Sequence, residues 1–482
     1  MPIRLGSIKF NRIEIAVLGI FLSVLLYNFF QLDGFHSWGD DFSSYLSQSK
    51  VIHDGEYSKL DNCVNLRIKY SEFQVGPNYY PWFYPLSLSF GFFIDLVDIL
   101  AIKQFSYIYS IFFYFALFLI FVKRLRFLLT LSLMIVFATH PFFIESNQHI
   151  LSDIYASGIL LIALYVLQRA YEQRSLARKI SCFALFSVVS FIAVNIRTSS
   201  NIIYLVAIGY AFIKYISDKK HSNFIFAITS FLLSYCFVTM FNSQFPSSNY
   251  LENHELITMD FLNHFVENLV YYFQLIIDFF FPFPLYAKTF FGLVFCYIFY
   301  RKRRIVWLHL SLAEKIFIFF YFGLFLFYPY QQGIRFIIPL LPFCLFILFV
   351  RFKVGINRYE KFFFSLYISL FLTFNAIRYL DNTDLDRSQL NPSFANSAYA
   401  EEAYDFIQRN TFVTESIVFF KPRALTYFTD RCSVWIESPE FLSRRDSYFL
   451  FFKGKEYSKQ MTDFLVQKRQ VFENKYFILY SL

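Results

Sequence analysis

Two adjacent aspartates, Asp40 and Asp41, follow the first long apolar run of the chain. One interpretation is a helix cap, because an aspartate accepts hydrogen bonds from the free amides at the start of the helix expected over residues 42–52. The other is chemistry, because a carboxylate at a membrane boundary can act as a general base or hold a cation. A cap needs only one acid, and a second adds repulsion. Both interpretations stay open at this point.

A second group of ionisable residues comprises Glu145, His149 and Asp153. Asp153 stands where an apolar run begins, so a helix cap by Ser152 or Asp153 is the alternative to a functional acid. No second histidine lies at metal-ligand spacing from His149, and the chain has no Cys-x-x-Cys pair. We therefore predict no zinc site, and a divalent ion held by carboxylates stays open.

Two arginines, Arg197 and Arg335, lie at ends of apolar runs opposite to the ends that carry the basic clusters. A guanidinium offers a planar fork that matches phosphate, so a phosphate or pyrophosphate at headgroup depth is one ligand. A phospholipid headgroup, or an ion pair with one of the acids, is the alternative. Tyr80 lies in the aromatic stretch 79–85, whose rings either stack on a sugar or form an interfacial belt.

The composition shows what must position these residues. Of 482 residues, 57% are hydrophobic and 16% are charged, whereas soluble domains carry about 25% charged residues. The net charge of +9 is spread in short basic groups between apolar runs, which is the positive-inside pattern and not a nucleic-acid surface. We therefore predict an all-α polytopic membrane protein that contacts membrane lipids and no nucleic acid.

Threading the apolar runs through a bilayer gives about 11 spans within residues 1–380 and puts the dense basic clusters on one side. Arg4, Lys9 and Arg12 precede the first span, residues 13–30, so we expect a cytoplasmic N-terminus and a retained anchor. The first outer loop, 31–104, then carries the acid pair and a surface helix over 85–102. The segment 261–281 is amphipathic and is expected to form a second surface helix.

From residue 381 the composition becomes that of a soluble protein. Helical periodicity over 400–408 and strand-like runs at 416–420, 432–436 and 476–480 predict a small α/β domain, 381–482, on the outer side. Cys63 and Cys432 both fall in segments placed outside, where a disulfide between them and two free thiols are both open.

Taken in order, these motifs resemble the GT-C superfamily of integral membrane glycosyltransferases. The resemblance is to the branch of protein O-mannosyltransferases and lipid A aminoarabinose transferases. The resemblance is carried by Gly39-Asp40-Asp41 with Tyr45, Tyr80-Pro81, His140-Pro141, Ser152-Asp153, Ile196-Arg197, Arg335-Phe336 and Lys421-Pro422-Arg423.

The resemblance implies an inverting transferase of the bacterial inner membrane, without a cofactor. It implies a sugar donor on polyprenyl phosphate, a lipid, glycan or protein acceptor, and transfer at the outer face. Asp40 or Asp41 would be the base, with Asp153 assisting. Arg335 and Arg197 would hold the donor phosphate. Tyr45, Tyr80, Glu145 and His149 are the further candidate substrate contacts. The lysine that aminoarabinose transferases carry after the first loop has no counterpart around 79–82, so the resemblance does not extend to the sugar.

Two other classes share parts of this pattern. A transporter or lipid flippase would concentrate its ionisable residues inside spans near the midplane, whereas the acids and arginines here lie at outer ends. An O-antigen polymerase or ligase would carry a long later outer loop rich in Arg and His. The segment 242–284 has His254 and His264 but no arginine, so we rank that class lower.

Overall fold

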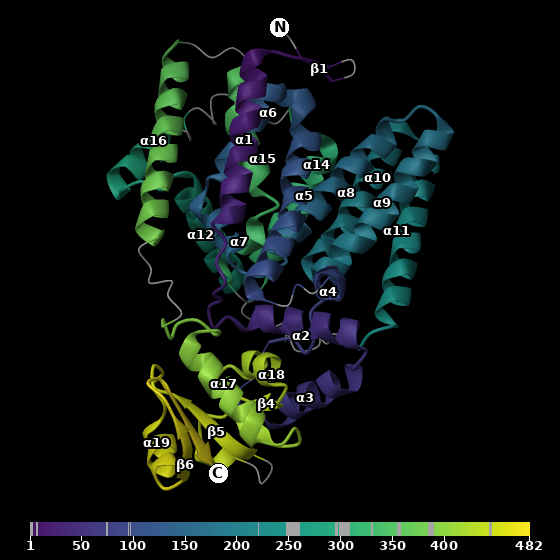
Figure 1. The fold of residues 1–482 in the computed structure, drawn as a ribbon. Helices are drawn as coiled ribbons and strands as arrows, with labels where there is room; N and C mark the ends of the chain where they lie inside the picture. Colours follow the sequence, from purple (N-terminus) through teal and green to yellow (C-terminus); the bar gives the residue numbers. More distant parts are fainter. Residues whose placement is uncertain are drawn as a thin grey trace.

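The protein is a bundle of helices with a small mixed domain at one end (Figure 1). The computed structural model describes residues 3–5, 8–73, 76–94, 96, 98–219, 221–246, 261–294, 297, 309–328, 331–353, 358–383, 390–442 and 446–482. The described chain is mostly helical, as the composition predicts. A short hairpin of β1 (Ile3–Leu5) and β2 (Ile8–Phe10) precedes the first helix.

The bundle is built mainly from long apolar helices. Its elements are α1 (Arg12–Phe30), α5 (Ile99–Leu125), α6 (Phe127–Ala138), α7 (Pro141–Asn147), α8 (Asp153–Glu172), α9 (Leu176–Ile196), η1 (Thr198–Asn201), α10 (Ile202–Asp218), α11 (His221–Asn242), α12 (Phe261–Phe280), α14 (Leu312–Leu326), η2 (Gly333–Ile337), α15 (Leu341–Lys353) and α16 (Arg358–Thr383).

Within the described residues, six helices are long and apolar enough to cross a membrane, and up to eight if each of two bent pairs is one span. The bent pairs are α6 with α7, at 62°, and His264–Phe280 with Leu285–Val294, at 98°. The predicted total of about 11 spans includes runs outside the described residues, so it stays a prediction. Pro141 begins α7 and His140 caps it, so the first bent pair breaks at these residues.

The first outer loop folds into α2 (Asp40–Asp54), α3 (Tyr57–Tyr70) and α4 (Phe83–Phe93). In Figure 1, α2 lies across the end of the bundle, between the long helices and the mixed domain. The surface helix predicted over 85–102 is shorter than expected. The Asp98 side chain accepts the Ala101 amide at 2.7 Å and begins α5 there, so the second span starts at Ile99, before residue 105.

The segment predicted as a second surface helix, 261–281, instead packs as α12 against α14 and η2. Tyr272, Phe279 and Phe280 are buried in the bundle core. Its amphipathic pattern therefore reflects one face turned to other helices and one face left outside.

The C-terminal domain contains one five-stranded sheet in the order β4-β3-β5-β7-β6. The strand β3 is parallel to β4 and β5, while β7 is antiparallel to β5 and β6. The predicted helix and three predicted strands are confirmed, whereas β5 and β6 are additional. The elements are α17 (Ala398–Asn410), β3 (Ser416–Val418), α18 (Pro422–Thr429), β4 (Ser433–Val434), η3 (Pro439–Phe441), β5 (Asp446–Phe452), α19 (Lys459–Val466), β6 (Arg469–Glu473) and β7 (Phe477–Ser481).

The entry to α2 is anchored in this domain. The indole Nε1 of Trp38 donates to the Pro392 carbonyl at 2.8 Å, and its ring packs against Phe419 and Phe420. Ser37 forms a β-bridge with Phe394. The residues just before the acid pair are therefore held by a segment more than 300 positions later in the chain.

A disulfide joins α3 to the strand edge of the C-terminal domain. Cys63 and Cys432 are bonded, with 4.7 Å between their Cα atoms and a separation of 369 positions in the sequence. The pairing that the sequence left open is therefore present. It closes a long loop, and long loops gain the most from a cross-link.

Replacing Cys63 with serine should lower the thermal stability of the detergent-solubilised protein, by about 2–5 kcal/mol, because the unfolded chain loses this constraint. The measurement is the thermal unfolding midpoint under non-reducing conditions. Cys236→Ser is the matched control, since Cys236 is exposed and free. Equal midpoints for the two variants would contradict a stabilising disulfide.

Candidate active site

Asp41 lies in the first turn of α2, where two side chains from other segments reach it. The Tyr80 hydroxyl donates to Asp41 Oδ1 at 2.5 Å. Arg335 Nη2 donates to Asp41 Oδ2 at 3.1 Å. The carboxylates of Asp41 and the guanidinium of Arg335 remain partly exposed, at 28% and 30%. An approaching molecule can therefore contact both groups.

Asp153 is the first residue of α8, and its side chain is only 4% exposed. It forms an ion pair with Arg197, and Arg335 Nε lies 3.6 Å from Asp153 Oδ1. Arg335 therefore stands between the two acids and interacts with both. A carboxylate this deeply buried needs such cations, because desolvation alone would strongly disfavour its charged form.

The local folds explain why these charges meet. The antiparallel helices α8 and α9 pack closely, so Asp153 at the start of one lies beside Arg197 just after the other. The close fit of α8 against α5 depends on Gly158, where an added Cβ would lie 2.5 Å from the Phe113 amide nitrogen. Small residues at such crossings let helices approach.

Tyr45 and Gln48 fix α2 against its neighbours on the face that carries Asp41. The Tyr45 hydroxyl lies 3.0 Å from Ser152 Oγ, beside the start of α8. Gln48 makes two hydrogen bonds to the main chain of Tyr80, at 2.9 and 3.0 Å. Burial raises the pKa of the Tyr45 hydroxyl well above its usual range, so Tyr45 acts as a neutral phenol.

The electrostatics of Asp41 follow from these contacts. Burial alone would raise the pKa of this carboxyl group. The charge of Arg335, the hydrogen bond from Tyr80 and the charge of Arg423 outweigh that effect and hold the pKa below its usual range. Asp41 is therefore an ionised carboxylate at neutral pH, able to accept a proton.

A small cavity of about 20 Å³ is lined in part by Asp153 and Arg335. Its lining includes His149, Ser106, Ser110 and Asn147 along with those two residues. Among the described residues, no group of three or more His, Cys, Asp or Glu side chains is arranged to hold a metal ion.

The structure thus brings together Asp41, Tyr45, Tyr80, Asp153, Arg197 and Arg335, and places His149 at the adjoining cavity. Glu145 lies apart, because its side chain is exposed on α7 and does not line the cavity. Asp40 begins α2, but its side chain falls outside the described part of the chain.

Three polar residues near the site were not expected from the sequence. Lys103 is fully buried in α5, with its Nζ 2.9 Å from Asp33 Oδ1. Burial lowers the pKa of His36, which is therefore neutral and accepts the Ile150 amide at 3.2 Å. A lone lysine inside an apolar run indicates a buried ion pair. Lys103 is such a residue, so its ion pair was the one that the sequence could have predicted.

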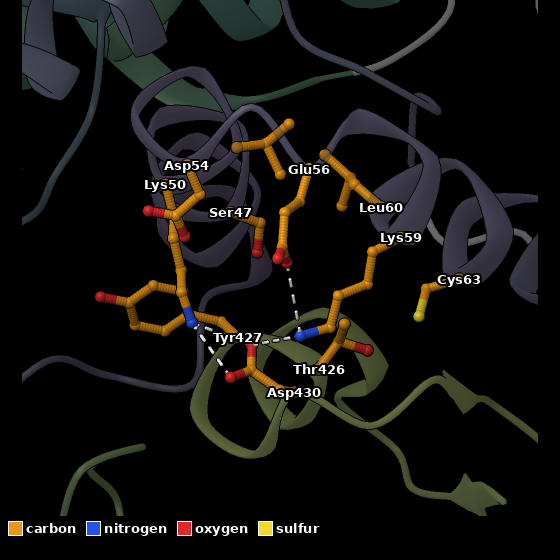
Figure 2. A pocket seen from close by; sticks show the side chains of 11 residues that line it. Ser47, Lys50, Asp54, Glu56, Lys59, Leu60, Cys63, Thr426, Tyr427 and Asp430 are labelled. Atoms are coloured by element: carbon orange, nitrogen blue, oxygen red, sulfur yellow. Dashed lines mark hydrogen bonds and ion pairs between the residues drawn. The ribbon is translucent and has the colours of Figure 1, made fainter. Parts of the chain in front are cut away.

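The opposite face of α2 meets the C-terminal domain, as Figure 2 shows. Lys50 Nζ lies 2.9 Å and Lys59 Nζ 3.7 Å from Asp430 Oδ1, at the end of α18. Cys63 lines the same pocket. One face of α2 therefore carries the acid–arginine cluster, and the other is clamped to α18.

Fold and site together define a polytopic membrane protein with a charged site at one end of its helical bundle. The chain has the fold of the GT-C membrane glycosyltransferases, so the resemblance predicted from the sequence is confirmed at the level of fold.

The particular similarities are to two kinds of solved structure. ArnT from Cupriavidus metallidurans bound to undecaprenyl phosphate has a TM-score of 0.57 and 10% identity, over 97% of this chain and 97% of that chain. The archaeal oligosaccharyltransferase AglB from Archaeoglobus fulgidus, in complex with an inhibitory peptide and a dolichol-phosphate, has a TM-score of 0.52 and 10% identity, over 92% of this chain and 69% of that chain. No family model and no curated protein matches the sequence.

Replacing Arg197 with glutamine should destabilise the protein by about 3–5 kcal/mol, because Asp153 would lose a partner inside a buried pair. The thermal unfolding midpoint in detergent measures this loss. Arg409→Gln is the control, since Arg409 pairs with Asp405 on the surface and such pairs contribute about 0–1 kcal/mol. Similar midpoints for both variants would show that the Asp153 pair does not stabilise the fold.

Proposed function

We propose that this protein is a membrane glycosyltransferase that moves a sugar from a polyprenyl-phosphate donor to an acceptor hydroxyl at the outer face of the membrane. The observation that carries the proposal is the pairing of Arg335 with Asp41. An anion-binding group and an ionised carboxylate lie in direct contact and are both partly exposed. The fold shared with ArnT bound to undecaprenyl phosphate supports the same substrate class.

The proposed reaction is a single displacement with inversion. The acceptor hydroxyl gives its proton to the Asp41 carboxylate as its oxygen bonds to the anomeric carbon. The bond from that carbon to the phosphate oxygen breaks, and polyprenyl phosphate leaves with the electron pair. Arg335 stabilises the developing negative charge, which is usually the largest contribution when phosphate departs. Asp41 needs little basicity, because an oxocarbenium-like sugar is itself strongly electrophilic.

The charges of the site suit an anionic donor. Among the described side chains, the three guanidinium groups of Arg197, Arg335 and Arg423 stand against the two carboxylates of Asp41 and Asp153. A transport pathway would instead place such charges near the middle of the bundle, whereas these lie at the ends of α8 and α9.

We propose the orientation that the sequence predicts, with the N-terminus in the cytoplasm and the C-terminal domain outside. The Cys63–Cys432 disulfide supports this orientation, because disulfides persist in oxidising compartments and are rare in the cytosol. A bacterial inner membrane would then present the site to the periplasm. Mass analysis of surface glycans in cells with and without the gene distinguishes a lipid, a glycan and a protein acceptor.

Replacing Asp41 with asparagine should lower kcat by about 10²–10⁴-fold, because the amide cannot accept the proton. The measurement is transfer from a polyprenyl-phosphate sugar by purified protein. Asp40→Asn is the direct comparison, and we expect it to retain most activity. Asp405→Asn, at an exposed site on α17, controls for expression. Full activity of Asp41→Asn together with loss in Asp40→Asn would contradict the assignment of the base.

Replacing Arg335 with glutamine should weaken binding of polyprenyl phosphate by about 10–100-fold, as expected when a charge-assisted hydrogen bond is removed. Direct binding of undecaprenyl phosphate to the detergent-solubilised protein measures this effect. Arg335→Lys keeps the charge but not the planar fork, so it should fall between glutamine and the native residue. Unchanged binding in both variants would place the phosphate elsewhere.

A further inference from the structure

We propose that Arg423, contributed by the C-terminal domain, is a positioning residue of the active site that holds Tyr80 in place and through it orients Asp41. The inference rests on the proposed function in one respect, since it takes Asp41 as the proton acceptor. It adds a role for the soluble domain, which would complete the site instead of only covering it.

Arg423 reaches out of its own domain into the first outer loop. Its side chain is buried, with 3% of the residue exposed. Its guanidinium carbon lies 5.7 Å from the centre of the Tyr80 ring, and Nη2 donates to the Pro77 carbonyl at 2.5 Å. The fit depends on Gly76, where an added Cβ would lie 2.8 Å from Arg423 Nη2.

These contacts fix the residue that binds the carboxylate. A cation over a ring face attracts the ring, and the attraction is stronger when the pair is desolvated. The Tyr80 main chain is already held by Gln48, so Arg423 restrains the remaining freedom of the ring. The hydroxyl of that ring donates to Asp41. The chain of contacts therefore runs from Arg423 through Tyr80 to the carboxylate oxygen.

Arg423 also acts on Asp41 by its charge. Its positive charge contributes to the lowered pKa of the Asp41 carboxyl group, beside the larger effects of Arg335 and Tyr80. The effect of the Arg423 charge on Asp41 can therefore be separated by experiment from the effect of its contact with Tyr80. A residue with a purely structural role would produce neither at Asp41.

The helix that carries Arg423 is clamped at its other end. Arg423 lies in the first turn of α18, and Asp430 follows the last turn. Lys50, on the opposite face of α2, and Lys59, in α3, both form ion pairs with Asp430 (Figure 2). The disulfide at Cys432 lies two residues further on. The position of Arg423 relative to α2 is therefore set by ion pairs and a covalent bond.

The test compares Arg423→Met with Arg423→Lys in the full-length protein, by the pH dependence of kcat/KM. Arg423→Met should lower kcat/KM by about 10–100-fold. It should also raise the apparent pKa on the acidic side of the kcat/KM profile by about half a pH unit or more, because a positive charge that favoured the ionised form of Asp41 is removed. Arg423→Lys keeps the charge, so the apparent pKa on the acidic side of the profile should stay at the native value while kcat falls.

A double-mutant cycle with Tyr80→Phe gives the second readout. Without the Tyr80 hydroxyl, Arg423 has nothing to position, so Arg423→Met should cost at least about threefold less in kcat/KM in that background. A separate cycle with Tyr80→Leu, which removes the ring, on the thermal unfolding midpoint reports the contact between Arg423 and the Tyr80 ring independently of catalysis. If Asp41→Asn kept full activity, the proposed function would fail while this coupling persisted.

Formation of the Cys63–Cys432 disulfide, seen by non-reducing electrophoresis, shows that the domain of each variant has docked. Arg423→Gln provides a second variant if the methionine variant does not fold. The proposal would be overturned by a docked variant that lacks the Arg423 charge and still has a kcat/KM within twofold of native. That variant would also show an unchanged apparent pKa on the acidic side of the profile and no coupling to Tyr80.

Discussion

The ion-pair cluster around Arg335 is the constraint on which the rest of the structure depends. Asp153 is almost fully buried at the end of a membrane bundle, and a carboxylate there is stable as an anion only with cations beside it. Those cations come from the turn after α9 and from η2. The helix ends must therefore converge, and the close fit of α8 against both α5 and α9 follows from that requirement.

Arg335 has two carboxylate partners of different character. Asp153 is buried and stabilises the guanidinium of Arg335. Asp41 is partly exposed, so the side of the guanidinium that contacts Asp41 is accessible to solvent. A phosphate that binds Arg335 would compete with Asp41 and not with Asp153, since only the Asp41 side is accessible. Donor binding would then weaken the ion pair that lowers the pKa of Asp41, so the carboxylate would become a better base when the donor is present.

The sequence could locate these residues but could not pair them. Asp153, Arg197 and Arg335 stand out because charge at the outer end of an apolar run is costly and rare. Their contacts depend on which helices are neighbours in space. The hydrophobic periodicity and the composition of the sequence do not determine this. The contacts of Asp41 come from Tyr80 and Arg335, which lie 39 and 294 positions later in the chain. Arg423 was visible only as part of a short motif, because its partners lie about 340 positions earlier.

The placement of the acid on α2, and not on a spanning helix, has a physical consequence. The helix α2 lies between the bundle and the C-terminal domain and is mostly buried, so its orientation is fixed from both sides. Tyr45 ties it to the bundle at Ser152, and Lys50 ties it to the C-terminal domain at Asp430. Trp38 fixes its entry in the same domain. In the proposed reaction the Asp41 carboxylate meets the acceptor within hydrogen-bond distance, and such restraint would favour it because small misplacements of reacting groups cost large factors in rate.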